Sequence, residues 1–215
     1  MSKIFRQQLI QVGQMINENV TLERIQDYNK DLQFRYMSRS IASGNLHNFI
    51  ESANILESEF PDFDYKTEYE KKDPEQNTML HNACINSKYF IIKHLLQNGF
   101  LSQINQKNKQ GRTPLMNIII NICTNSRFNK ELFDLLLQNG ADILAKDNLG
   151  KTIMDYLQLL GDNFNGADYI KQKYAEMKTR ESRLNLLYCI NQSTQNNEYI
   201  KKLNFYEKLS IMKYM

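Results

Sequence analysis

The side chains that could carry chemistry are few and scattered in this sequence. Its three histidines and three cysteines are His47, His81, His94, Cys84, Cys123 and Cys189. Their spacing matches no His-Glu-x-x-His motif, no Cys-x-x-Cys pair and no mixed Cys/His zinc set. The odd number of cysteines also argues against a disulfide framework. We therefore expect reduced thiols and no metal site.

Alternating carboxylates form the next candidate site, at Glu57 and Glu59 and again at Asp62 and Asp64. This pattern could hold a divalent cation, but the segment lacks the central glycine and the terminal glutamate of a calcium-binding loop. The sequence also has no glycine-rich phosphate loop, no dinucleotide fingerprint and no Gly-x-Ser-x-Gly motif. We therefore predict no catalytic residues and no cofactor, and we expect a protein that is not an enzyme.

The composition indicates a helical globular protein. With 215 residues, the chain can form one long domain or two small ones. It contains only 8 glycines and 3 prolines, which argues against an all-β protein with many turns. A net charge of +3 is too mild to indicate nucleic-acid binding. The longest apolar run, 115–123, is interrupted by Asn117 and Asn121, so we expect no transmembrane segment.

Internal repeats give the strongest information about the fold. The segment that begins at Thr78 is echoed by segments that begin at Thr113 and Thr152, and Leu-Leu-Gln-Asn-Gly occurs at both 95–99 and 136–140. A threonine hydroxyl can cap the first turn of a helix, and a glycine can close the last turn in the left-handed conformation. The repeats therefore predict pairs of helices, each pair beginning at Thr and ending at Gly.

These repeats are similar to those of the ankyrin-repeat family, whose unit of about 33 residues is a β-turn followed by two helices. The family signature Thr-Pro-Leu-His-x-Ala is matched at 78–83 except for Met79, and 111–115 matches the Gly-x-Thr-Pro-Leu opening. The connector Gly-Ala-Asp-Ile-Leu-Ala-Lys-Asp-Asn-Leu-Gly-Lys-Thr at 140–152 follows the family pattern almost position for position. The resemblance implies an all-α helical solenoid of about four repeats, strongest over 77–161, in which His81 bonds backbone in the turn region.

The expected organisation has three parts. Residues 1–32 form an N-terminal helical flank, 33–178 form the ankyrin-repeat domain, and 179–215 form a C-terminal helical extension. We expect an extended acidic loop at 55–76 and an insertion of about six residues near 123–128. We also expect helices at 167–177, 183–190 and 198–214. Residues 1–17 form a basic amphipathic segment, which is either a packing helix or a mitochondrial address.

The resemblance also implies a partner, because the family's scaffold binds other proteins. We expect a non-catalytic scaffold that binds one or more proteins, not nucleic acid, as a structural or accessory subunit of a large complex. A mitochondrial respiratory-chain assembly is the first candidate, and a soluble cytosolic adaptor with one transient target is the alternative. The chain is thus expected inside the cell, in mitochondria or cytoplasm. The predicted contact residues are Phe63, Tyr65, Lys107, Lys109, Gln110, Arg112, Lys146, Asn148 and Lys151.

Overall fold

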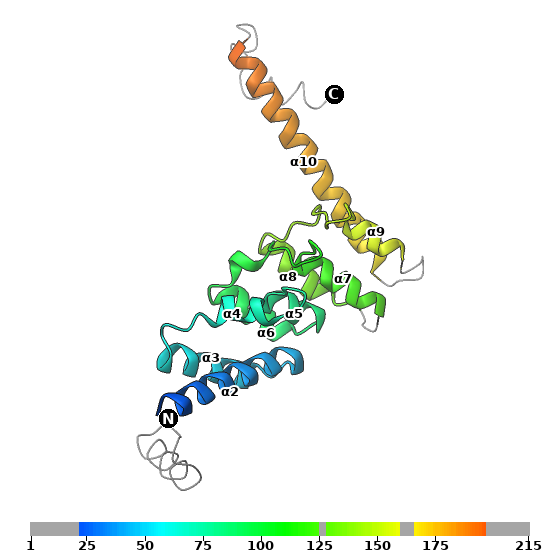
Figure 1. The fold of residues 1–215 in the computed structure, drawn as a ribbon. Coiled ribbons are helices and arrows are strands. Elements are labelled where there is room, and N and C mark those ends of the chain that lie inside the picture. Colours follow the sequence, from blue (N-terminus) through cyan, green and yellow to red (C-terminus); the bar gives the residue numbers. More distant parts are fainter. Residues whose placement is uncertain (1–21, 125–127, 160–165, 197–215) are drawn as a thin grey trace. The chain divides into compact units, whose positions relative to one another are not determined.

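The computed structural model describes residues 22–124, 128–159 and 166–196. The chain divides into two compact units, 1–164 and 165–215. The described part of the first unit contains α2 (Leu22–Ser43), α3 (Leu46–Glu59), α4 (Tyr65–Lys72), α5 (Met79–Ile85), α6 (Tyr89–Gln97), the short 3₁₀ helix η1 (Leu101–Gln103), α7 (Pro114–Thr124), α8 (Lys130–Gln138) and α9 (Ile153–Gln158). The described part of the second unit contains one helix, α10 (Ala167–Asn196) (Figure 1).

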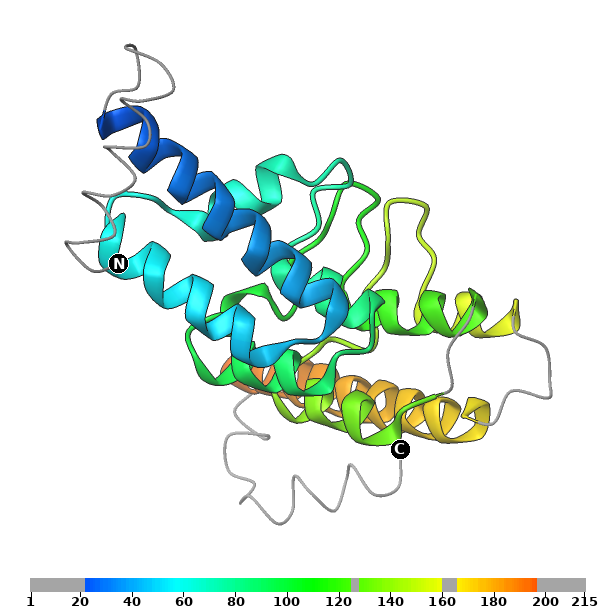
Figure 2. The ribbon, with the colours of Figure 1, turned by 90° about the horizontal axis from the view of Figure 1, so that it is seen from below.

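The first unit is a stack of helical repeats. Helix α2 packs against α3, α5 against α6, and α7 against α8, so each of these pairs forms one repeat. The first helices of neighbouring repeats also touch, since α2 contacts α5, α5 contacts α7, and α7 contacts α9. Figures 1 and 2 show α2 and α3 side by side at one end of this stack. The described residues form helices and no strand, which confirms the predicted all-α ankyrin-repeat solenoid.

Both predicted end signals of the repeat helices are confirmed. The Thr78 hydroxyl accepts a hydrogen bond from the His81 N–H and caps α5, and the Thr113 hydroxyl does the same for the Met116 N–H of α7. Gly99 and Gly140 follow α6 and α8 with φ angles of 87° and 89°, the left-handed conformation that ends a helix. The helix ends read from the sequence at these four positions are therefore correct.

The core of the first unit runs continuously through the repeats. Its fully buried side chains include Phe49 of α3, Leu95 of α6, Leu115 of α7 and Phe133 of α8. The apolar faces of α6 and α8 are buried, apart from Leu137, which is only partly covered. Each repeat thus gains its stability by burying apolar surface against its neighbours.

The prediction of an extended acidic loop at 55–76 is wrong, because helices form most of this segment. Helix α3 runs to Glu59, and the eight-residue helix α4 begins six residues later at Tyr65, capped by the Asp64 carboxylate. Tyr65 and Tyr69 lie one helical turn apart and are both buried, so they fix α4 to the stack. Burial of these two aromatic side chains stabilises a helix here, although most of the residues around them are charged.

Two predicted boundaries fall inside helices. Helix α2 continues across 32–33, and α10 continues across 178–179, where we had expected separate helices at 167–177 and 183–190. No glycine or proline occurs between 167 and 196, so nothing in the local sequence interrupts α10. The predicted helices at 1–17 and 198–214 lie outside the described residues, as does part of the insertion near 123–128. The described part of that insertion lengthens α7 to 11 residues, compared with 7 in α5.

Candidate functional site

Three loops of the first unit share one hydrogen-bonding pattern, and we call them the fingers: 73–78, 108–113 and 147–152. In each finger, a side-chain oxygen of the first residue accepts from the backbone N–H groups two and four residues later. The distances are 2.9 and 3.1 Å at Asp73, 3.1 and 3.0 Å at Asn108, and 2.8 and 2.8 Å at Asp147. The first side chain thus fixes the backbone of its finger.

Neighbouring fingers are joined to one another through their backbones, and Figure 2 shows them side by side. The Lys109 N–H donates to the Glu75 carbonyl at 2.9 Å, and the Asn148 N–H donates to the Gln110 carbonyl at 3.0 Å. The Asn148 amide also donates to the Lys109 carbonyl at 3.0 Å. A Cβ atom at Gly111 would lie 2.2 Å from Asn148 Oδ1, so this close approach requires glycine. The three fingers form one continuous surface.

His81 connects α5, in which it lies, to the backbone of the second finger, as the family resemblance predicted. Its Nδ1 accepts from the Thr78 N–H at 3.2 Å, so Nε2 carries the proton and donates to the Arg112 carbonyl at 2.9 Å. Burial lowers the pKa of His81 below its usual value, despite the opposing effect of that carbonyl. His81 is therefore a neutral, buried structural residue.

A cluster of three polar side chains joins the second and third fingers to α9: the buried Asp147 and Tyr156 and the half-buried Arg112. The Tyr156 hydroxyl donates to Asp147 Oδ2, and Arg112 Nε donates to the same hydroxyl at 3.3 Å. The Arg112 guanidinium also lies 5.7 Å from the centre of the Tyr156 ring. Desolvation raises the pKa of Asp147, but hydrogen bonds from Tyr156, Lys151 and Leu149 outweigh it and leave the pKa below its usual value. Asp147 is therefore ionised and holds the finger.

Seven of the nine predicted contact residues lie on or beside the second and third fingers. The exposed ones are Lys107, Lys109, Lys146, Asn148 and Lys151, and the half-buried ones are Gln110 and Arg112. The Lys107 ammonium donates to the Lys146 carbonyl at 2.7 Å and so bridges two connectors. Among the described residues, no carboxylate pairs with these four lysines. The second and third fingers thus present a basic surface, whereas the first finger carries the exposed Glu75.

The two predicted aromatic contacts lie elsewhere: Phe63 in the short loop between α3 and α4, and Tyr65 in the first turn of α4. Tyr65 is only 5% exposed, and its hydroxyl donates to Glu57 Oε1 at 2.6 Å. Phe63 is half-buried and packs edge to face on Phe34 at 5.9 Å. The expectation that Tyr65 is an accessible contact is wrong, because it is a packing residue of α4.

One exposed apolar residue of the third finger was not among the contact residues predicted from the sequence. Leu149 is 78% exposed, between Asn148 and Gly150. Its position in the family's turn pattern was a usable signal, because the residue between the turn asparagine and the turn glycine must lie at the surface. Leu149 adds an apolar anchor to the basic surface of the fingers.

The described residues offer little for other chemistry. No group of three or more His, Cys, Asp or Glu side chains among them is arranged to hold a metal ion. Cys84 is completely buried, and burial raises the pKa of its thiol, which therefore stays protonated and unreactive. None of the described helices is sufficiently long and apolar to cross a membrane.

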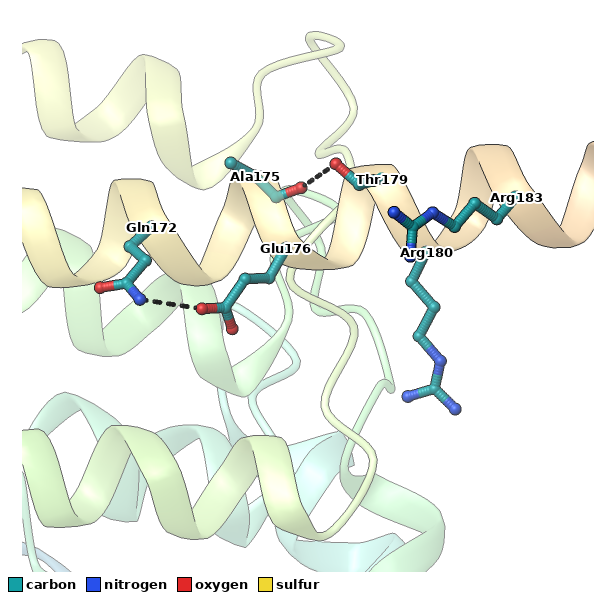
Figure 3. Close-up of a pocket in the computed structure, with 6 residues that line it drawn as sticks. All are labelled: Gln172, Ala175, Glu176, Thr179, Arg180 and Arg183. Atoms are coloured by element: carbon teal, nitrogen blue, oxygen red, sulfur yellow. Dashed lines mark hydrogen bonds between the residues drawn. The ribbon is translucent and has the colours of Figure 1, made fainter. Parts of the chain in front are cut away.

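The described part of the second unit presents a shallow depression along one side of α10 (Figure 3). Two hydrogen bonds lie along it, from Gln172 Nε2 to Glu176 Oε1 and from the Thr179 hydroxyl to the Ala175 carbonyl, both at 2.9 Å. Arg180 completes it with an exposed guanidinium. Because its lining comes from a single helix, the depression is open to solvent and encloses no site.

The comparisons with known proteins agree with this geometry. A family model of ankyrin repeats in three copies matches residues 41–147, which include the first and second fingers and end at the first residue of the third. A search of curated proteins finds no match.

Proposed function

The chain belongs to the ankyrin-repeat family, and from this premise we propose that it is a non-catalytic scaffold whose second and third fingers bind a partner protein. Ankyrin repeats form a module for protein–protein interaction, and the family is typically non-catalytic. The observation that carries the proposal is the basic finger surface formed by Lys107, Lys109, Lys146 and Lys151, with Leu149 beside it. Because hydrogen bonds from Asp or Asn hold the finger backbone, the exposed side chains of the fingers can vary without loss of core packing.

The chemistry of the finger surface defines the partner. None of its lysines forms an ion pair with a carboxylate of the described residues, so an acidic surface on the partner would complement them. Leu149 would add an apolar contact beside these lysines, since interfaces bury apolar side chains at their core. The partner is therefore expected to carry acidic residues around an apolar cleft.

The proposed context is a stable multi-subunit complex, with a mitochondrial respiratory-chain assembly as first candidate. The support comes from the sequence: a basic amphipathic segment at 1–17, an insertion within the repeats, and an aromatic-rich segment at 198–214. The alternative proposal is a soluble cytosolic adaptor that binds one target transiently. It is favoured by the family itself, whose repeats need no assembly in order to bind.

The test is a native pull-down of the tagged full chain from its own cells, followed by sizing and identification of the co-purifying proteins. The triple variant K109A/K146A/K151A removes three finger charges, and K71A/K93A/K178A removes three exposed lysine charges elsewhere as a matched control. We expect the finger variant to lose the partner and the control to keep it. Equal capture by both variants would contradict binding through the fingers.

The same experiment separates the two contexts. Recovery of the chain at stoichiometric ratio in one large particle would support the subunit proposal, and the companions would identify the compartment. Recovery of a free 25.4 kDa chain with one substoichiometric companion would support the adaptor.

A further inference from the structure

A second depression lies away from the fingers, between α3, the start of α4 and the turn that follows α6. We call it the α3–α6 pocket, and it has a volume of about 480 Å³. Its buried aromatic and aliphatic lining comes from Phe49, Ala53, Tyr65 and Phe100. The pocket is large enough for one side chain of another molecule, and no finger residue lines it.

The lining of the α3–α6 pocket is negative. Glu57 lies at its rim, and its Oε1 accepts from the Tyr65 hydroxyl, while Oε2 has no partner among the described residues. His94 is the lining residue whose side chain could become cationic. Burial lowers the pKa of His94, so its imidazole is neutral at pH 7. None of the other lining residues can carry a positive charge.

Two further features favour a cation in this pocket. Helix α6 ends at Gln97, and the negative end of the helix dipole attracts positive charge, although the His94 and Leu95 carbonyls already accept hydrogen bonds from Asn98 and Phe100. The aromatic ring of Phe100 already attracts one ammonium group, because Lys66 Nζ lies 4.4 Å from its centre, although Lys66 does not line the pocket. Aromatic faces bind guanidinium groups in the same way.

We propose that the α3–α6 pocket binds an arginine side chain of a partner polypeptide. The aliphatic part of the arginine would lie on Phe49 and Ala53, and its guanidinium would donate to the free Oε2 of Glu57. Arginine fits better than lysine, because its planar group can stack on an aromatic ring and donate to a carboxylate at once. The pocket thereby gives the scaffold a second contact, of opposite charge to the fingers.

The probe for this proposal is the peptide acetyl-Gly-Arg-Gly-amide, titrated into the ¹⁵N-labelled full chain and followed by NMR. Its neutral isostere, with citrulline in place of arginine, has a urea oxygen in place of one guanidinium nitrogen and carries no charge. We expect the arginine peptide to shift the amide signals of Gly99 and Phe100 and of the second half of α3, with a dissociation constant of about 1 mM. The citrulline peptide should cause no saturable shift at the same concentrations.

The matched variants are Glu57→Gln and Glu51→Gln, which remove one carboxylate each from α3. Glu57→Gln keeps an oxygen for the Tyr65 hydroxyl, so the fold should persist, and its NMR spectrum checks this. We expect it to bind the arginine peptide about tenfold more weakly, as for the loss of one charge-assisted hydrogen bond. Glu51→Gln lies outside the pocket and should bind as the unaltered chain does.

Three outcomes would overturn the proposal: no saturable shift with the arginine peptide, equal binding of the citrulline peptide, or equal binding by Glu57→Gln. The proposal is independent of the fingers. If K109A/K146A/K151A loses its partner while Glu57→Gln binds arginine normally, the finger proposal stands and the pocket proposal fails.

Discussion

The polar residue that follows each finger in the next helix differs from one finger to another. In one of the three, its side-chain amide is buried without a hydrogen-bond partner among the described residues. Nine residues after the first residue of each finger lie Asn82, Asn117 and Tyr156. The Asn82 amide donates to Asp73 Oδ2 at 2.9 Å, and Tyr156 donates likewise to Asp147. The second finger begins with Asn108, which has an amide nitrogen in place of a second oxygen, and that nitrogen donates to Asn77 Oδ1. Asn117 Nδ2 is buried and has no partner among the described residues.

The unpaired amide of Asn117 leads to a prediction about stability. The variant Asn117→Leu removes a buried donor without a partner and places an apolar side chain of similar size in the core. We expect it to raise the free energy of unfolding by about 1 kcal/mol, measured by urea denaturation. Asn82→Leu is the matched control, since it removes a donor that has partners and should destabilise the fold by a similar amount. A loss of stability in Asn117→Leu would mean that this amide has a partner in solution.

The neutral imidazole of His81 predicts a dependence of stability on pH. Its pKa in the folded chain is lowered by burial, whereas in the unfolded chain it is close to about 6.5. As the pH falls below about 6.5, the unfolded state takes up the proton first, so the free energy of unfolding decreases towards the folded-state pKa. Above about 6.5 the contribution is fully present.

Urea denaturation at about pH 7.5 and about pH 5.5 measures this effect. We expect His81→Gln to lose less stability between the two values than the unaltered chain does. His94 is shifted in the same direction and leaves a residual loss in that variant. The control is His47→Gln, because His47 is exposed, and it should show the full pH dependence. An identical pH dependence in His81→Gln would assign the effect to other groups.

At the scale of elements, the buried side of α8 and the exposed fingers should respond differently to substitution. Leu136 is completely buried there, and Leu136→Ala should reduce the free energy of unfolding by about 2–5 kcal/mol through the cavity it creates. Lys109 is exposed on the second finger, and Lys109→Ala should change it by less than about 0.5 kcal/mol. Equal losses in the two variants, measured by urea denaturation, would contradict this division.

The elements also show why some of the structure could be predicted and some could not. The helices from α5 to α9 follow from Thr caps and Gly ends, because these signals act within a single turn of the chain. Helix α4 was missed because its charges suggested a loop, although Tyr65 and Tyr69 at one-turn spacing were the available signal. The α3–α6 pocket had no signal, because it depends on how side chains from two successive repeats and the connector between them meet.

At the scale of the whole molecule, surface charge differs between the finger surface and the α3–α6 pocket. The fingers expose unpaired lysines, and the pocket exposes a carboxylate with one free oxygen. A partner that used both would carry acidic and basic residues in separate places, which fixes its orientation better than either contact alone. Such a requirement suits a scaffold that holds one partner in a defined position.

The division into two units predicts that they respond separately to mutation. Residues 175–185 of α10 are all exposed, and Thr179 lies in the middle of them. Thr179→Pro removes a backbone donor inside the helix and should cost about 3 kcal/mol of local helix stability. We expect a lower helical signal in circular dichroism, with an unchanged urea midpoint for the first unit, because its core contains no residue of this segment. Thr179→Ala should keep both signals. A lower midpoint in Thr179→Pro would show that the exposed half of α10 supports the repeats, and that the chain unfolds as one unit.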